Sequence, residues 1–363
     1  MTRRLVEGSE AIAEAMVAAG CRFFSGYPMT PFTEVLEHMA RLLPDVGGVC
    51  MNAESELEAV GMAWGAASTG TRSATGSVGQ GLSLMQESLS EICHARLPLV
   101  VLNMARGQGD YYQATRGGGH GDYRHIVLAP SDIPEAVRLA QLAFDLADRW
   151  RNPVMFLGDY YLAHVQEAVE ISPLEFPPLP AKDWGLDGSS GGTGAAKMIS
   201  PINRNKRSDA DFIEHGTHLG LIADSVRAMA EGVEPLVEVI GADDAELIVV
   251  AYGTPGRYVR FVVEELRREG APIGMVRPIT LWPFPTKAIE SLATGDRSFA
   301  VYELNTGQMF DDVRLAVLGR CPVEFIGGMS FDHSGFGVAP DLGVELLRDR
   351  ICGTLDNARK ERV

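Results

Sequence analysis

The sequence predicts an α/β protein with two domains, each built around a parallel sheet. Between residues 9 and 157, short apolar strands alternate with helical stretches, which is the pattern of a parallel sheet covered by helices on both faces. The same alternation returns at residue 247, after a segment rich in proline, glycine and polar residues. The chain has 363 residues, which is enough for two such domains and a connection.

Local signals place the elements of the first half. A helix from Ser9 to Gly20 begins and ends on residue types that are common at these positions. Ser131, followed by Glu135, begins a helix that reaches about residue 150. The remaining pattern predicts strands at 21–26, 48–52, 72–76, 97–104 and 153–157, helices at 31–43, 54–68 and 82–95, and a glycine turn at 79–81.

A change in composition separates the two halves. Four prolines between residues 173 and 180 lead into a glycine- and serine-rich stretch at 188–194 and a polar stretch at 203–207, which indicate an extended linker. A helix at 222–240 is expected to close this connection. The second half predicts strands at 247–253, 273–276 and 298–302 and helices at 256–269, 285–293 and 308–318. We therefore expect domains at 1–165 and 244–363, joined by a linker and connecting helix at 166–243.

Composition excludes several classes of protein. The net charge of −16 argues against nucleic acid or an anionic membrane surface as the main partner. No apolar run reaches the length of about 18 residues that a transmembrane helix needs. Glu7 places an acidic side chain where a signal peptide would need its apolar core. These observations predict a cytoplasmic protein that binds neither nucleic acid nor membrane.

The five cysteines are scattered along the chain, with no C-x-x-C spacing. This pattern excludes an iron–sulfur ferredoxin motif and an ordinary zinc site within the chain, so no metal ligands are predicted. Free and mostly buried thiols in a reducing cytoplasm account for it.

The most informative segment is the strand-to-helix turn at 25–31, whose sequence is SGYPMTP. Pro31 suits the first position of a helix, where its missing N–H costs nothing, and Thr30 suits the N-cap before it. The cap would then lie at the carboxyl end of a strand with helix N–H groups pointing outward, where open α/β sheets bind anionic ligands. A purely structural turn has the same features, so the turn alone does not define a site.

Two further features follow in order along the chain. A helix begins in the acidic segment 54–58, and Arg106 follows an apolar strand. A capped turn, an acidic helix start and a strand-end arginine in this order resemble domain I of the thiamine-diphosphate-dependent 2-oxoacid:ferredoxin oxidoreductases. That family has Tyr-Pro-Ile-Thr-Pro at the turn, and Met29 replaces the isoleucine here. The segment 277–285 resembles the C-terminal domain that transketolase-like enzymes share with this family. The resemblance implies a pyrimidine-recognising thiamine-diphosphate-type domain followed by a transketolase-C-terminal-like domain.

The resemblance also implies which residues hold the cofactor. Thiamine diphosphate reacts through C2 of its thiazolium ring, and the enzyme supplies one carboxylate beside N1′ of the aminopyrimidine. Glu56 matches the family's glutamate, which precedes a helix of small residues. As an isolated acid it would equally serve the helix dipole, which is the role expected of Glu54 and Glu58. Pro28 in the turn and Gln80 between two glycines are the other cofactor-binding candidates.

Arg106 and Thr30 are the substrate-binding candidates by the same resemblance. A guanidinium at the end of a parallel strand can hold the carboxylate of a 2-oxoacid through two parallel hydrogen bonds. The alternative is an arginine that fixes its own glycine-rich loop. This loop, 106–123, is too rich in glycine to be helical and is expected to cover a pocket and exclude water. His120 within it would serve either in proton transfer or in stabilising the loop.

One signature of the family is missing. The Gly-Asp-Gly…Asn motif that binds magnesium and the diphosphate is absent, and the nearest fragment is Gly-Asp-Tyr at 158–160. The resemblance therefore implies a β subunit that supplies the diphosphate site, its Mg²⁺ and a [4Fe-4S] cluster. A γ subunit and a ferredoxin-like subunit commonly complete such a complex.

We therefore expect the α subunit of an enzyme that oxidatively decarboxylates a 2-oxoacid with coenzyme A to acyl-CoA and CO₂ and reduces ferredoxin. The second half of the loop 106–123 resembles the branched-chain members, so 3-methyl-2-oxobutanoate is the first substrate expected. The run after Arg106 is shorter than in those relatives, which leaves 2-oxoglutarate and pyruvate as alternatives. A non-redox thiamine-diphosphate enzyme half and a non-catalytic scaffold paralogue are the other functions that the sequence allows.

Overall fold

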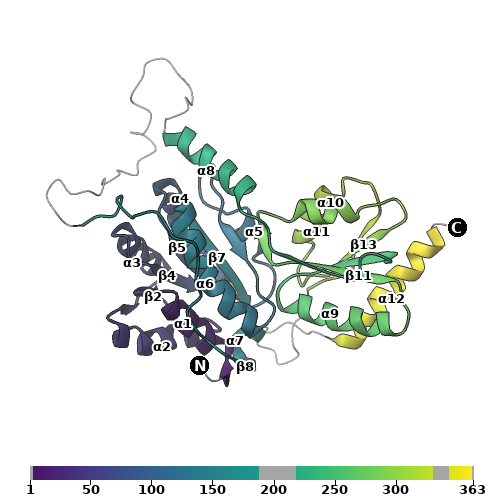
Figure 1. The fold of residues 1–363 in the computed structure, drawn as a ribbon, viewed down its shortest axis with the longest axis horizontal. Helices are drawn as coiled ribbons and strands as arrows, with labels where there is room; N and C mark the ends of the chain where they lie inside the picture. The colour runs from purple at the N-terminus through teal and green to yellow at the C-terminus, as the bar shows by residue number, and fades with distance from the viewer. Residues whose placement is uncertain (1–2, 188–217, 330–342, 362–363) are drawn as a thin grey trace, which may run out of the picture.

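The computed structural model describes residues 3–187, 218–329 and 343–361. Its strands form a seven-stranded sheet, a five-stranded sheet and a two-stranded sheet. The seven-stranded sheet lies in the N-terminal half and the five-stranded sheet in the C-terminal half, with the two halves side by side (Figure 1). Among the described helices, none is both long enough and apolar enough to cross a membrane.

The seven-stranded sheet has the order β12-β6-β7-β5-β4-β2-β3. Its members are β2 (Phe23–Gly26), β3 (Val49–Asn52), β4 (Ser73–Ser77), β5 (Leu99–Ala105), β6 (Ile126–Leu128), β7 (Pro153–Asp159) and β12 (Thr280–Trp282). Six of these strands are parallel, and β12 pairs antiparallel with β6 at one edge. Because β12 belongs to the C-terminal half of the chain, that half contributes the edge strand of the N-terminal sheet.

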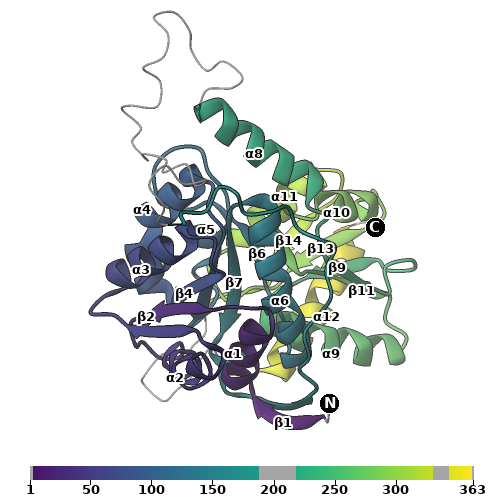
Figure 2. The same ribbon diagram turned by 60° about the vertical axis from the view of Figure 1, so that its left-hand side comes forward.

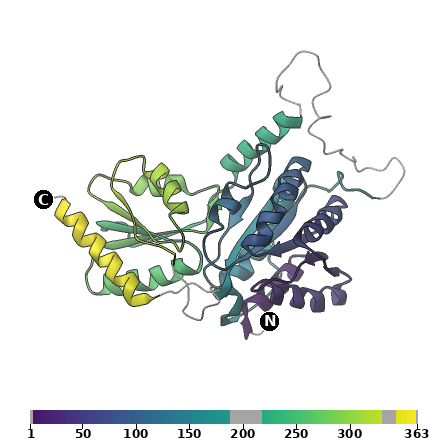
Figure 3. The same cartoon turned by 180° about the vertical axis from the view of Figure 1, so that it is seen from behind.

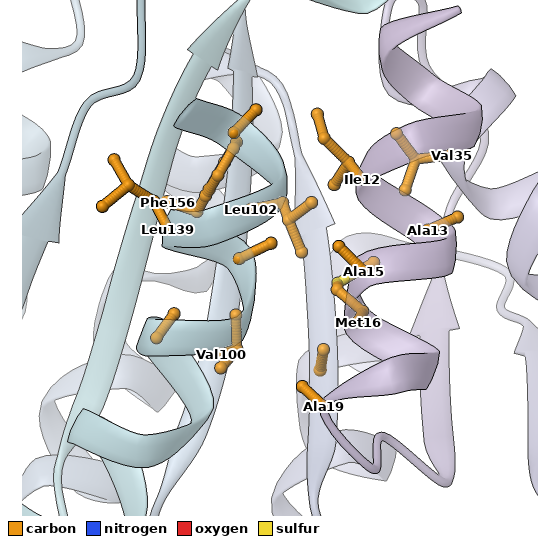
Figure 4. Packing of buried hydrophobic residues seen from close by; sticks show 14 of the residues in the cluster. Ile12, Ala13, Ala15, Met16, Ala19, Val35, Val100, Leu102, Leu139 and Phe156 are labelled. Carbon is orange, nitrogen blue, oxygen red and sulfur yellow. The ribbon is translucent and has the colours of Figure 1, made fainter. Parts of the chain in front are cut away.

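Helices cover both faces of this sheet. They are α1 (Gly8–Ala18), α2 (Thr33–Leu42), α3 (Glu56–Ser68), α4 (Gly79–Ala95), α5 (Tyr111–Thr115), α6 (Ile133–Trp150) and α7 (Tyr160–His164), with a 3₁₀ turn η1 (Pro44–Val46). Alternate residues of β5 point to opposite faces. Val100 and Leu102 pack against α1 and α6, as Figure 4 shows, whereas Leu99 and Val101 belong to the core under α3 and α4. Such a strand is apolar without alternation because both of its faces are buried.

The five-stranded sheet has the order β14-β13-β10-β11-β9. Its strands are β9 (Val237–Ile240), β10 (Leu247–Val250), β11 (Ile273–Pro278), β13 (Ser298–Val301) and β14 (Val323–Phe325), and its helices are α9 (Gly253–Arg268), α10 (Thr286–Leu292), α11 (Gln308–Val317) and α12 (Val344–Glu361). Four strands are parallel, and β9 is antiparallel at the edge. Figure 3 shows α12 and α9 on one face of this sheet and α10 and α11 on the other.

The predicted fold class, two parallel-sheet α/β domains, is confirmed. The domain bounds 1–165, 166–243 and 244–363 stay a prediction. The first residues of the expected linker form β8 (Gln166–Val169), which pairs antiparallel with β1 (Arg4–Glu7). The stretches at 188–194 and 203–207 lie outside the described residues.

The predicted helix at 222–240 is wrong in its second half. The helix α8 spans His218–Gly232, and Val237–Ile240 form β9 instead. Gly232 and Pro235 interrupt the helical pattern, and three of the four residues of β9 are β-branched. The strand pairs with β11, which lies about 35–40 residues further along the chain, so its partner is not visible in the local sequence.

Two predicted helix starts differ from the structure. Ser9 does not cap α1, because its hydroxyl donates to the carbonyl of Ala163 over 3.0 Å and Glu7 occupies the N-cap position. The helix expected from Ser131 begins at Ile133, since the side chain of Asp132 accepts the capping hydrogen bond. Asp132 is itself a favoured N-cap residue, whereas Glu7 makes no capping hydrogen bond through its side chain.

The predicted cap at Thr30 is also wrong. The Thr30–Pro31 peptide is cis, and Phe32 N–H donates to the Met29 carbonyl over 2.7 Å, which closes a turn before the helix. Helix α2 therefore begins at Thr33 and has no side-chain cap.

Two glycine-rich segments form helices that were not predicted from the sequence. The predicted turn at 79–81 is the first turn of α4, and the loop 106–123 contains α5, which was expected to be non-helical. Glycine lowers helix propensity by about 1 kcal/mol, and packing can outweigh this cost. Tyr111 in α5 is fully buried and donates a hydrogen bond to Asp312 on α11 over 2.6 Å.

Candidate active site

The predicted site residues meet at one edge of the seven-stranded sheet. Strands β5, β4, β2 and β3 are parallel neighbours, so their carboxyl ends lie along the same edge. Pro28 and Thr30 follow β2, Glu56 follows β3, Gln80 follows β4 and Arg106 follows β5. Helices α3 and α4 begin at this edge and lie side by side on one face of the sheet (Figure 2). Pro28 and Gln80 are exposed there.

Glu56 is the buried member of its acidic segment. Ser55 caps α3 by accepting a hydrogen bond from the Glu58 N–H at 3.3 Å, which makes Glu56 the first helical residue. Glu56 is 3% exposed, whereas Glu54 and Glu58 are exposed. Of the three acids near the helix start, Glu56 is therefore the one whose side chain is buried.

The carboxylate of Glu56 is closely packed against Ser77 and Gly81. Ser77, the last residue of β4, donates from its hydroxyl to Oε1 over 3.1 Å. A Cβ on Gly81 would lie 2.4 Å from this same oxygen and 2.0 Å from the Ser77 hydroxyl, so any larger residue would displace them. A buried carboxylate fixed in this way suits a ring nitrogen of the aminopyrimidine, and the residues present fit that end of thiamine diphosphate.

Arg106 and Thr30 lie in contact. Arg106 Nε donates to the Thr30 carbonyl oxygen over 3.0 Å, so the arginine fixes the turn after β2. Thr30 is exposed, and Arg106 is half-buried. The side-chain hydrogen bonds of Arg106 and Glu56 thus connect different residues at this edge, Arg106 with Thr30 and Glu56 with Ser77.

Asp110 lies beside the start of α4 and was not recognised in the sequence. Asn103, buried in β5, donates to its carboxylate over 3.0 Å, and a Cβ on Gly79 would lie 2.3 Å from it. Burial raises the pKa of Asp110, although the hydrogen bond from Asn103 opposes this shift. No local pattern marks Asp110, because its environment comes from β5 and α4.

Gln108 connects the loop 106–123 with the second sheet. Its side chain donates to the Tyr252 carbonyl over 3.1 Å and accepts from the Leu304 N–H at 2.8 Å. Its backbone carbonyl accepts from Asn305 at 2.9 Å. The loop is therefore held by both halves of the chain, which the sequence analysis also missed.

The Gly-Asp-Tyr fragment at 158–160 has a structural role. Asp159 caps α7 through the Leu162 N–H at 2.9 Å and accepts from the Thr254 hydroxyl at 2.9 Å, and burial raises its pKa. Magnesium prefers oxygen ligands. Within the described ranges, the one cluster of three or more potential metal ligands contains two histidines, so these residues do not assemble the oxygen-rich set for a magnesium diphosphate.

Comparison with known proteins gives the class first. The family model described as pyruvate flavodoxin/ferredoxin oxidoreductase, thiamine diP-binding, matches residues 14–211, which is more than half of the chain. The core domain II model of pyruvate:ferredoxin oxidoreductase matches residues 245–333. The fold and these matches define a thiamine-diphosphate-binding oxidoreductase subunit.

Individual relatives agree with this class. The ketoisovalerate oxidoreductase subunit VorB of Methanothermobacter thermautotrophicus is 39% identical, over 91% of this chain and 94% of its own length. The 2-oxoglutarate synthase subunit KorA of the same organism is 33% identical, over 88% and 93%. The chain belongs to the 2-oxoacid:ferredoxin oxidoreductase family, as an α-type subunit, which confirms the resemblance seen in the sequence.

Two solved structures show the same fold. The 2-oxoglutarate:ferredoxin oxidoreductase from Magnetococcus marinus, solved with 2-oxoglutarate, coenzyme A and succinyl-CoA bound, has a TM-score of 0.79 at 24% identity. The match covers 98% of this chain and 65% of that longer chain. A split-gene transketolase, an inactive β4 tetramer, has a TM-score of 0.59 at 15% identity, covering 97% and 98%.

Proposed function

We propose that this chain binds the pyrimidine end of thiamine diphosphate and the carboxylate of a 2-oxoacid. Together with a partner subunit, it would convert the 2-oxoacid and coenzyme A to acyl-CoA and CO₂ and reduce ferredoxin. The observation that carries the proposal is the buried carboxylate of Glu56 at the same sheet edge as Arg106 and Thr30. The higher identity to a ketoisovalerate subunit than to a 2-oxoglutarate subunit, 39% against 33%, favours a branched-chain substrate. 2-Oxoglutarate and pyruvate remain alternatives.

Each residue has a role that follows from its surroundings. When bound, thiamine diphosphate supplies a nucleophilic carbon for attack on the 2-oxo group. Glu56 holds negative charge beside the pyrimidine ring, with Ser77 and Gly81 fixing its orientation. Arg106 uses Nε for the turn, so its two terminal nitrogens would bind the substrate carboxylate. Thr30, Pro28 and Gln80 would line the same edge.

A β subunit is expected to complete the site. None of the five cysteines, all of which lie in the described part of the chain, forms a disulfide bond, and three of them are buried. A [4Fe-4S] cluster would belong to the partner subunits. The helix that begins with Glu56 has exposed apolar residues, Leu57 at 50% and Met62 at 38%. These residues would contact the partner domain that binds the diphosphate and its Mg²⁺. A γ subunit and a ferredoxin-like subunit would complete the complex.

The proposal is tested by comparing the chain alone with the complex purified together with its native partners. The chain alone should contain no iron and bind thiamine diphosphate weakly, whereas the complex should bind it tightly with Mg²⁺ and be brown. The complex should reduce an electron-accepting dye with a branched-chain 2-oxoacid only when coenzyme A is present. Tight stoichiometric cofactor binding by the chain alone would contradict the divided site. Product formation without dye reduction would favour a non-redox enzyme, and an inactive complex would favour a scaffold.

Arg106→Lys in this complex should raise KM and lower kcat/KM by about 10- to 100-fold for the preferred 2-oxoacid. Lysine keeps the charge but loses the planar fork that binds a carboxylate through two hydrogen bonds. Steady-state kinetics over a panel of 2-oxoacids measures the change. Arg116→Lys is the matched control, because Arg116 lies in the same loop and pairs with Asp312. Unchanged kinetics in Arg106→Lys would assign Arg106 to the turn alone.

A further inference from the structure

Three metal-ligating side chains meet near the C-terminal end of α4, whereas Gln80 lies at the start of this helix. Glu91 and His94 lie three positions apart on α4, and His120 comes from the loop 106–123. One ligand atom of each residue lies within 4.8 Å of those of the other two. Glu91 Oε1 is 3.1 Å from His120 Nε2 and 3.9 Å from His94 Nδ1. The imidazole rings of the two histidines are 5.3 Å apart.

The backbone around His120 is fixed on α4 by specific contacts. The N–H groups of Gly118 and Gly119 donate to the Tyr123 hydroxyl at 3.0 and 2.8 Å, and the Gly118 N–H also donates to the side chain of Gln86 at 2.8 Å. Gly121 has a φ of +79°, and a Cβ there would lie 2.7 Å from the His94 ring. The loop can therefore pass directly over His94, and this path brings His120 to Glu91.

The three side chains match the preferences of a zinc-class ion. Two imidazole nitrogens and one carboxylate oxygen form a ligand set typical of zinc, with a water molecule as the fourth ligand. Ligand distances of about 2.0–2.1 Å place neighbouring ligand atoms about 3.3–3.4 Å apart in a tetrahedral site. The two distances from Glu91 lie on either side of this value. His120 is 53% exposed and belongs to a loop, so it can adjust, whereas His94 is 3% exposed and offers a fixed ligand.

We propose that Glu91, His94 and His120 bind one divalent transition-metal ion of the zinc class, which attaches the loop 106–123 to α4. The cysteine spacing in the sequence predicts no zinc site, and this cluster contains no cysteine. The ion would be separate from the magnesium of thiamine diphosphate, since it has nitrogen ligands. His120 would then stabilise the loop through the metal rather than transfer protons at the substrate.

The test uses the full chain, free of affinity tags and treated with a chelator. Co²⁺ should bind with one-to-one stoichiometry and give visible absorption bands of a nitrogen- and oxygen-ligated ion, and Zn²⁺ should displace it. Zn²⁺ should also raise Tm, because a ligand that binds the folded state stabilises it. His120→Ala should weaken Co²⁺ and Zn²⁺ binding by about 10- to 100-fold. The circular dichroism spectrum should not change, because His120 is exposed. Glu91→Gln should have a similar effect.

His38→Ala is the matched control, since His38 lies on α2, contacts Arg41 and is not one of the three residues of this cluster. It should leave the Co²⁺ spectrum and affinity unchanged. The absence of saturable Co²⁺ or Zn²⁺ binding at submillimolar concentrations would overturn the proposal. Wild-type affinity in His120→Ala would overturn it as well.

Discussion

Glu56→Gln is expected to slow exchange of the C2 hydrogen of bound thiamine diphosphate by about 100-fold or more. Glutamine keeps the size and position of the side chain between Ser77 and Gly81 but removes the negative charge. A fixed charge in a site from which water is excluded stabilises a developing positive charge far more than the same charge in water. The cofactor itself should still bind to the assembled complex, because the diphosphate end supplies most of the binding energy.

The measurement is hydrogen–deuterium exchange at C2 in the complex, followed by NMR in the absence of substrate. Glu54→Gln is the matched control, because Glu54 is exposed just before the same helix and should leave the exchange rate unchanged. A wild-type exchange rate in Glu56→Gln would show that Glu56 is not the carboxylate beside the pyrimidine. Equal slowing in both variants would indicate a general effect of charge at the helix start.

Arg277→Met is expected to lower the free energy of unfolding by about 3–5 kcal/mol. Arg277 on β11 is 5% exposed. Its two terminal nitrogens donate to Glu135 on α6 at 2.8 and 3.1 Å, and its Nε donates to Glu238 on β9 at 2.7 Å. The substitution would leave two partly buried carboxylates without their shared cation. Because Glu135 belongs to the first half of the chain, the loss would affect the contact between the halves.

Urea-induced unfolding followed by circular dichroism measures this effect. Arg260→Met is the matched control, because Arg260 pairs with Glu238 and Glu264 but is exposed, and an exposed pair contributes about 1 kcal/mol or less. Replacing Glu135 by glutamine in the Arg277→Met background should recover part of the loss. Equal losses in Arg277→Met and Arg260→Met would contradict a buried ion-pair network.

The same network predicts a pH dependence. Burial by itself would raise the pKa of Glu135, but the hydrogen bonds and charge of Arg277, together with Ser131 and Arg138, outweigh it and lower the pKa below its usual value. The stability from this shift is present above the usual carboxyl pKa and is lost as the pH falls through the lowered value. The deficit of Arg277→Met should therefore be largest near neutral pH and shrink in acid, where Glu135 in the variant can take up a proton.

The fold class and most of the strands and helices around the candidate site could be predicted from the sequence alone. Strands such as β5 are apolar on both faces, and helices such as α6 have one apolar side, so their residue patterns carry the information locally. The order of the turn at 25–31, the acidic helix start and Arg106 also placed these residues at adjacent strand ends. The family followed from them, and the comparisons with known proteins confirm it.

The contacts of each of these residues depend on segments that are distant in the sequence. Glu54, Glu56 and Glu58 look alike in the sequence, and only the positions of Ser77 and Gly81 on β4 and α4 make Glu56 the buried one. The helix start that the sequence assigned to Thr30 and Pro31 lies at Thr33.

Long-range pairing determined the remaining differences. Val237–Ile240 were expected to be helical, yet they form β9 because β11 offers an open edge. The helix α5 forms in a glycine-rich loop because Tyr111 packs against α11, about 200 residues away. Hydrogen bonds and burial between distant segments contribute as much free energy as local propensity, and the local sequence does not contain their partners. Most of the helices and strands around the candidate site could therefore be read from local patterns, whereas β9, α5, the ends of several helices and the burial of Glu56 depend on contacts between segments far apart in the chain.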